Sequence, residues 1–226
     1  KYNHSDDGPG TPTTKILEVI EFEMVGIADV DIDKTTGPVG TVVNVQGEGF
    51  APTEYININY YHTSTNYIAI DTIVSGSDQV GSDGTFEFSF AIPDSIYGAH
   101  NIVFEGERSH AKKTFTFSVT PSVTINKSSG QGGDTVIIYA KGFLRSSDVN
   151  IYIGSVKLDE DDSTTVSDKT DTTGSLTYVV TIRNSVTADT YDILVRDDTN
   201  SSVRATAQFE IDLASELEIS ESTANV

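Results

Sequence analysis

Residues 30–58 read VDIDKTTGPVGTVVNVQGEGFAPTEYINI, and residues 123–151 read VTINKSSGQGGDTVIIYAKGFLRSSDVNI. The second stretch follows the first at a constant offset of 93 residues, and alternating Val and Ile, spaced glycines and a Gly-Phe pair recur in register. A repeat of this length corresponds to a whole small domain rather than to one solenoid unit. The chain is therefore predicted to contain two copies of one module.

Each copy continues with short strands separated by turn residues. The clearest period-two run is Phe86, Phe88 and Phe90, with Glu87 and Ser89 between them. In the first copy we expect strands near residues 29–34, 41–47, 55–61, 67–74, 85–92, 100–105 and 113–119, and the second copy matches them. Short strands with frequent turns are typical of a sandwich. The prediction is an all-β chain with two tandem immunoglobulin-like β-sandwich domains, at 29–120 and 121–212.

A further strand is predicted ahead of the first copy, inside an N-terminal tail of residues 1–28. Residues 16–25 alternate between apolar and acidic side chains, although a helix is the alternative. A lone amphipathic strand is not stable in water, so it must pair with its own module or with a neighbouring copy of the chain. The residues expected to carry such assembly are Ile16, Val19, Ile20, Phe22 and Met24. A C-terminal tail, residues 213–226, holds a weaker alternating segment.

The amino-acid composition of the chain disfavours some classes of binding partner. The chain has 34 acidic and 14 basic residues, a net charge of −20, and every segment named above is net acidic. This charge disfavours nucleic acid and anionic membranes as partners. No stretch approaches the roughly 18 apolar residues of a membrane span. With no cysteine, the chain forms neither disulfides nor thiolate metal sites.

Catalytic motifs are missing from the sequence, and we expect a protein that is not an enzyme. There is no Gly-x-Ser-x-Gly elbow and no cysteine nucleophile, and the four histidines have no metal-binding spacing. The cluster from Gly130 to Gly133 precedes a predicted strand and not a helix, which favours a turn over a phosphate site.

Calcium is the only cofactor that the sequence suggests, and none is required. Hard cations prefer clustered oxygen ligands on loops. The strongest cluster is Asp159, Glu160, Asp161 and Asp162; weaker ones involve Asp168 and Asp171, Asp197 and Asp198, and the alternating Asp29, Asp31 and Asp33. The alternative is that these are solvated acidic loops. Three Asn-x-Ser triplets, at Asn3, Asn126 and Asn200, would accept glycans in an exported chain.

The repeated pattern resembles a known family. Lys-x-x-Gly-x-x-Gly, alternating valines, Gly-Phe, Asp-Gly-Thr-Phe and Tyr-Gly-x-His are similar to IPT/TIG-like modules of prokaryotic cell-surface, surface-layer or extracellular filament proteins. The resemblance covers residues 29–212 and implies an extracellular or cell-surface location. The second copy departs from it, because Thr173-Gly174 replaces Asp-Gly and Ala140 replaces a turn glycine.

Two functions follow as hypotheses. In the first, the chain is a structural subunit of a filament or surface lattice, and its N-terminal strand enters the next copy. In the second, it is an adhesin or carbohydrate-binding spacer that recognises surface glycans. Exposed aromatic residues would stack on sugars in that case, and the sequence nominates Tyr60, Tyr61 and Tyr67; the alternative is that they pack across strands.

Overall fold

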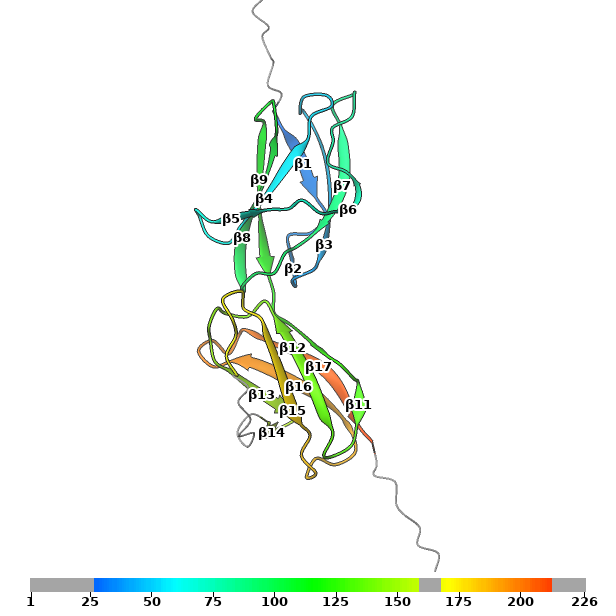
Figure 1. The fold of residues 1–226 in the computed structure, drawn as a ribbon, viewed down its shortest axis with the longest axis vertical. Coiled ribbons are helices and arrows are strands. Elements are labelled where there is room, and N and C mark those ends of the chain that lie inside the picture. The colour runs from blue at the N-terminus through cyan, green and yellow to red at the C-terminus, as the bar shows by residue number, and fades with distance from the viewer. Residues whose placement is uncertain (1–26, 159–167, 213–226) are drawn as a thin grey trace, which may run out of the picture.

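The computed structural model describes residues 27–158 and 168–212. These residues form two β-sandwiches, which we call module one and module two, stacked along the long axis of the molecule (Figure 1). Module one, which contains β1, lies at one end of this axis, and module two, which contains β17, lies at the other. The prediction of an all-β chain with two tandem immunoglobulin-like sandwiches is confirmed.

Module one contains a four-stranded and a five-stranded sheet. The strand order of the first is β1 (Asp29–Ile32), β3 (Val42–Glu48), β7 (Phe86–Ala91) and β6 (Ile73–Ser77). The order of the second is β2 (Thr36–Gly37), β9 (Lys112–Val119), β8 (Gly98–Gly106), β4 (Ile56–Tyr61) and β5 (Tyr67–Ala69). All neighbours are antiparallel except β2 and β9, which are parallel.

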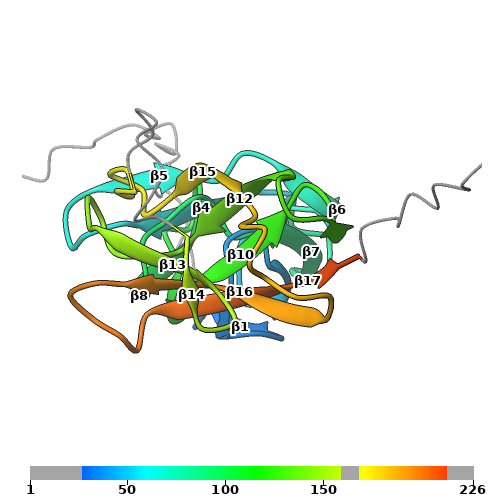
Figure 2. The same cartoon turned by 90° about the horizontal axis from the view of Figure 1, so that it is seen from below.

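Module two repeats this arrangement. One sheet has the order β10 (Ser122–Ile125), β12 (Thr135–Lys141) and β15 (Leu176–Thr181). The other has the order β11 (Ser129–Gly130), β17 (Arg204–Ile211), β16 (Thr190–Asp197), β13 (Val149–Ile153) and β14 (Val156–Lys157), and β11 is parallel to β17. Figure 2 views the molecule along its long axis, with β12 and β15 facing β16 and β17 across the module-two core. Strand β6 has no counterpart among the described residues of module two.

The alternation in the sequence sets which side chains fill each core. On β7, Phe86, Phe88 and Phe90 are at most 6% exposed, whereas Glu87 points outward. Each apolar side chain of this size contributes about 1.5–3 kcal/mol when it is buried. Among the described residues, each module has its own cluster of buried apolar side chains.

The prediction of one strand over residues 67–74 is wrong. The segment forms two strands that belong to different sheets, since β5 pairs with β4 and β6 pairs with β7. Ile70 still donates its N–H to Ile58 O, and the chain then crosses to the other sheet, where pairing begins with a bulge between Ile73 and Ser75. The two-residue strands β2 and β11 were also not predicted, because such short parallel pairs have no hydrophobic period.

The two modules contact each other directly. Strand β9 ends at Val119 and β10 begins at Ser122, so only Thr120 and Pro121 join them. Tyr97 N–H donates to Phe143 O at 2.9 Å, and the Lys141 ammonium lies 2.8 Å from Asp94 Oδ1. A short connection with contacts on both sides restricts how the modules can move relative to each other.

A candidate ligand-binding face on module one

Strand β4 displays polar and aromatic side chains on its outer surface. Ile56, Ile58 and Tyr60 face the core, and the alternation of the strand therefore turns Asn57 and Asn59 outward. Tyr55, immediately before β4, is 49% exposed. The sequence Tyr-Ile-Asn-Ile-Asn thus places a ring and two amides along one line of the sheet surface.

The neighbouring strands complete this surface. Tyr67 of β5 is 49% exposed, and its ring centroid lies 5.1 Å from that of Tyr61 on β4. On the other side, Glu105 of β8 lies opposite Asn57 in the register. We call Tyr55, Asn57, Asn59, Tyr67 and Glu105 the tyrosine–asparagine face. Together with Asp71, Asp78, Glu107 and His110, these residues border a hollow of about 590 Å³.

The two asparagine side chains of this face have no intramolecular partner. Within residues 27–158 and 168–212, no hydrogen bond joins either amide to another group. Each amide supplies two N–H donors and one carbonyl acceptor. Glu105, by contrast, is engaged, because Lys112 Nζ lies 3.0 Å and His110 Nδ1 3.5 Å from its Oε1.

The same positions in module two are occupied by internal contacts. Asn150, the counterpart of Asn57, donates to Asp198 Oδ1 at 2.9 Å. Tyr152, the counterpart of Asn59, is covered by the Arg196 guanidinium, 5.3 Å from its ring centroid, and accepts a hydrogen bond from it. At these two positions, therefore, module one presents polar groups without a described partner, and module two has side chains that already make contacts.

A buried carboxylate holds one border of the face in place. Glu54 is 2% exposed and accepts hydrogen bonds from Ala51 N, Arg108 N, Ser109 N and Ser109 Oγ, at 2.6–2.9 Å. Burial raises the pKa of Glu54, but the bonds from Ser109, Arg108 and Ala51 outweigh it and leave the pKa lowered. The ionised carboxylate fixes the loop after β8, which carries Glu107 and His110.

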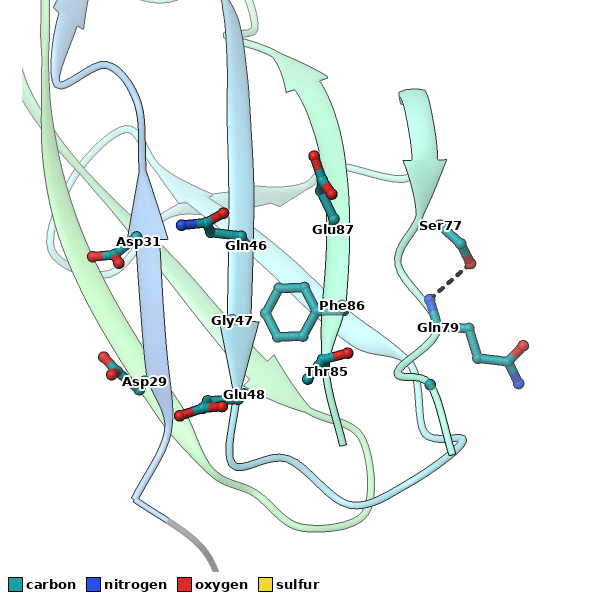
Figure 3. Close-up of a pocket in the computed structure, with 11 residues that line it drawn as sticks. Asp29, Asp31, Gln46, Gly47, Glu48, Ser77, Gln79, Thr85, Phe86 and Glu87 are labelled. Atoms are coloured by element: carbon teal, nitrogen blue, oxygen red, sulfur yellow. Dashed lines mark hydrogen bonds between the residues drawn. The ribbon is translucent and has the colours of Figure 1, made fainter. Parts of the chain in front are cut away.

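A second hollow, of about 630 Å³, lies on the other sheet of module one (Figure 3). We call it the acidic hollow, because its lining includes four carboxylates: Asp29, Asp31, Glu48 and Glu87. Its one aromatic ring, Phe86, is only 6% exposed and packs where Gly47 leaves room. Asp29 lies directly opposite Glu48, and no Lys or Arg lines the hollow. This surface offers like charges without an aromatic platform, and we assign it no ligand.

The predicted assembly strand and the strongest predicted calcium cluster lie outside the described residues. This applies to Ile16, Val19, Ile20, Phe22 and Met24, to Asp159, Glu160, Asp161 and Asp162, and to the glycan acceptor Asn3. The acceptors Asn126 and Asn200 are both exposed, and their side-chain oxygens accept backbone bonds from Ile137 and Ser202.

Two other predicted calcium ligands already accept hydrogen bonds from their own loops. Asp171 Oδ1 accepts from Thr173 and Ser175, and Asp197 Oδ1 accepts from Thr199 and Asn200. In the part of the chain that the structure describes, no three His, Asp or Glu side chains are arranged to hold a metal ion.

The three tyrosines that were predicted to stack on sugars differ in how far they are exposed. Tyr60 is 0% exposed, so its nomination is wrong, because it sits at a core position of β4. Tyr61 is half-buried beside Tyr67, which is exposed. Tyr55 was missed, although its place two residues before Asn57 in an alternating run gave the signal.

Comparisons with known proteins give distant similarities only. No protein-family model and no curated protein matches the chain. Among solved structures, it is similar to a glycan-utilisation protein, SGBP-B from a xyloglucan utilization locus of Bacteroides uniformis (17% identity, 80% of this chain and 48% of that chain, TM-score 0.31). It is also similar to a tetra-tandem repeat from the extending region of a large adhesion protein (14% identity, 81% and 49%, TM-score 0.35).

A third similar structure is the Escherichia coli adhesin FdeC (9% identity, 83% of this chain and 65% of that chain, TM-score 0.31). This chain spans about half the length of the first two structures. At these identities and TM-scores the similarities carry no functional argument. The described residues include no helix long and apolar enough to cross a membrane.

Proposed function

We propose that the chain is a non-enzymatic, extracellular binding module that recognises a neutral carbohydrate through the tyrosine–asparagine face. The observation that carries this proposal is the contrast between the modules. Asn57 and Asn59 have no partner among the described residues, whereas Asn150 and Tyr152 at the same positions of module two are engaged. Module two and the direct junction then serve as a spacer.

The chemistry of the face suits a polyhydroxylated ligand. A tyrosine ring offers a flat apolar surface with a polar tip, and the C–H face of a sugar ring can pack against it. An asparagine amide both donates and accepts, so it can pair with two neighbouring hydroxyls. The hollow of about 590 Å³ lies within the roughly 300–1,000 Å³ that is usual for ligand sites.

The surrounding charge selects the type of sugar. Asp71, Asp78, Glu105 and Glu107 border the hollow, and His110 is the one basic residue in its lining. Negative charges around a site repel acidic ligands at low and moderate ionic strength. A neutral oligosaccharide is therefore favoured over a uronic acid polymer.

The test is a glycan array of neutral and acidic oligosaccharides, followed by calorimetry on the best ligand. Replacing both asparagines, Asn57→Ala with Asn59→Ala, should weaken binding about tenfold or more, since each lost ligand hydrogen bond costs about 0.5–1.5 kcal/mol. Tyr67→Ala should weaken it similarly. Tyr139→Ala is the matched control, because Tyr139 is 40% exposed on module two.

Two results would refute this proposal. One is an array on which no neutral oligosaccharide binds. The other is a ligand whose affinity is unchanged by the double asparagine variant and by Tyr67→Ala while both variants remain folded.

A second candidate function is a filament or surface lattice formed by exchange of the N-terminal strand. The observation that favours it is the open edge of the four-stranded sheet, where no described strand pairs with the outer side of β6. On this strand Val74 is 54% exposed. An exposed sheet edge can take an added strand from another copy, which would bring Ile20, Phe22 and Met24 onto that copy.

This candidate predicts that assembly depends on one side of residues 16–25. Ile20→Asp with Phe22→Asp should abolish polymers seen by negative-stain electron microscopy, because charged residues cannot be buried on a sheet. The matched control, Glu21→Lys with Glu23→Lys, changes the opposite side and should leave polymers in place. Deletion of residues 1–27 should also leave folded, unassembled β-protein; polymers that survive it rule out the strand mechanism.

A further inference from the structure

A small hollow of about 250 Å³ lies where the two modules meet. We call it the junction hollow, and both modules line it. Module one contributes His62, Asn66 and Ile96, and module two contributes Arg145, Thr172 and Thr173. None of these six residues is acidic. In a chain with 34 acidic and 14 basic residues, such a lining is unusual.

Arg145 has no anionic partner in the part of the chain that the structure describes. No hydrogen bond or ion pair joins its guanidinium to a described residue. Several lysines do have a carboxylate partner: Lys34, Lys112, Lys127 and Lys141 each have one within 3.0 Å. An unpaired guanidinium carries five N–H donors in a planar fork that fits an oxyanion.

His62 adds a second basic group to the same hollow. Burial lowers the pKa of His62, and electrostatic interactions with His100 and Arg145 lower it further. The imidazole also packs edge-on against Tyr60, with ring centroids 5.5 Å apart. His62 and Arg145 therefore repel each other when both are charged, and a bound anion would remove this repulsion.

Two carboxylates that neighbour the lining residues in the sequence have other partners. Asp171, next to Thr172, receives hydrogen bonds from Thr173 and Ser175 on its Oδ1. Asp94, near Ile96, pairs with Lys141 across the same junction. Neither lines the junction hollow, and none of the described residues that line it is a carboxylate.

We propose that the junction hollow binds a small oxyanion, a carboxylate or a phosphate, through the Arg145 guanidinium and the His62 imidazolium, with the Thr172 hydroxyl and the Asn66 amide as further donors. The volume is below the roughly 300 Å³ at which ligand pockets usually begin, so one anionic group fits and an oligosaccharide does not. This site is separate from the tyrosine–asparagine face and does not depend on its ligand.

Two properties follow from the location. The donors come from both modules, so the anion is bound only while the modules stay in contact, and binding stabilises the junction. Binding should also tighten as the pH falls through the pKa of His62, because protonation adds a second positive charge. The groups that face this imidazole are His100, Tyr60 and Arg145; none is a carboxylate.

The test uses the full chain and follows the histidine ring signals by NMR during separate titrations with inorganic phosphate, acetate and glucuronate. We expect a saturable shift of the His62 signals and a higher pKa of His62 in the presence of the anion. Saturation by phosphate alone identifies a phosphate ligand, and saturation by both carboxylates identifies a carboxylate ligand.

Variants separate a site from a general charge effect. Arg145→Met should weaken anion binding about tenfold or more and raise the pKa of His62 in the free protein, because a nearby positive charge is lost. Arg145→Lys should retain part of the affinity. Arg204→Met removes an exposed arginine that does not line the hollow and should change nothing. The proposal is overturned by shifts that stay linear in anion concentration, or by equal binding to the wild type and Arg145→Met.

Discussion

Glu54 is a single side chain on which a whole loop of module one depends. Its carboxylate is nearly inaccessible to solvent and accepts four hydrogen bonds, three of them from backbone N–H groups. In module two the counterpart of Glu54 is Ser147, and a different buried carboxylate, Asp197, accepts the loop N–H groups of Thr199 and Asn200. The two modules thus organise this end of the sandwich with carboxylates at different places: Glu54 lies two residues before β4, and Asp197 ends β16.

Glu54→Gln should destabilise module one by about 1–3 kcal/mol at neutral pH, because the amide group turns one acceptor into a donor that faces other donors. The pKa of Glu54 is lowered in the folded state, so its stabilisation is complete above the ordinary value of 4.5 and is lost as the pH falls through the folded-state pKa. Urea denaturation at pH about 7 and about 3.5 measures both effects.

The control for this measurement is Glu87→Gln, an exposed carboxylate on β7. It should change stability by no more than about 0.5 kcal/mol. Equal losses for Glu54→Gln and Glu87→Gln would show that the buried carboxylate has no special role.

At the same scale, the sequence contains the orientation of the aromatic residues in and beside β4 but not the contacts that they make. Alternation places Tyr60 on the side of Ile56 and Ile58, and it places Tyr55 and Tyr61 on the side of Asn57 and Asn59. The buried partners of Tyr60, among them His100 at 5.3 Å, come from β8, about 40 residues away in the chain. The packed structure is needed to place the exposed Tyr67 of β5 beside Tyr61 of β4.

Among the elements, the pairing of β1 with β3 contains an unfavourable contact. Asp29 and Glu48 lie directly opposite each other, and like charges across a strand pair are destabilising. Asp29→Asn should therefore raise the free energy of unfolding by about 0.2–1 kcal/mol in low salt. The gain should largely vanish near 1 M salt, where the Debye length falls to about 3 Å.

Asp31→Asn is the control, since Asp31 lies on the same strand and the same side but opposite the neutral Gln46. Thermal unfolding of both variants in low and high salt makes the comparison. Equal gains would mean that general negative charge, and not the Asp29–Glu48 pair, accounts for the effect.

The strands themselves were largely predictable from the sequence, and the exceptions have a physical cause. Runs such as Phe86 to Phe90 have a strong period of two. The repeat shows the same alternation a second time, in the matching strands of module two. The split of residues 67–74 was not predictable, because the exposed β5 and β6 carry almost no inward-facing apolar residues. Edge strands are held by backbone pairing, for which the sequence gives little signal.

For the whole molecule, the repeat predicted two modules but not the contacts between them. The donors of the junction hollow lie in loops that carry no periodic pattern, and His62 and Arg145 are 83 residues apart in the chain. Such loops converge only because the strands that flank them end at the same boundary. The junction hollow was therefore beyond sequence analysis, whereas the fold that supports it and one ring of the tyrosine–asparagine face, Tyr67, were not.

The parallel pairs β2–β9 and β11–β17 have a mechanical consequence. In module one, Ser118 and Thr120 of the closing segment donate to Thr35 and Gly37 near its beginning; in module two, Glu210 and Asp212 donate to Ser128 and Gly130 in the same way. A pulling force between the two ends of the molecule would load the bonds of each patch in shear, so that they must rupture together and cannot unzip one by one. A tether built from such modules would resist tension along its length.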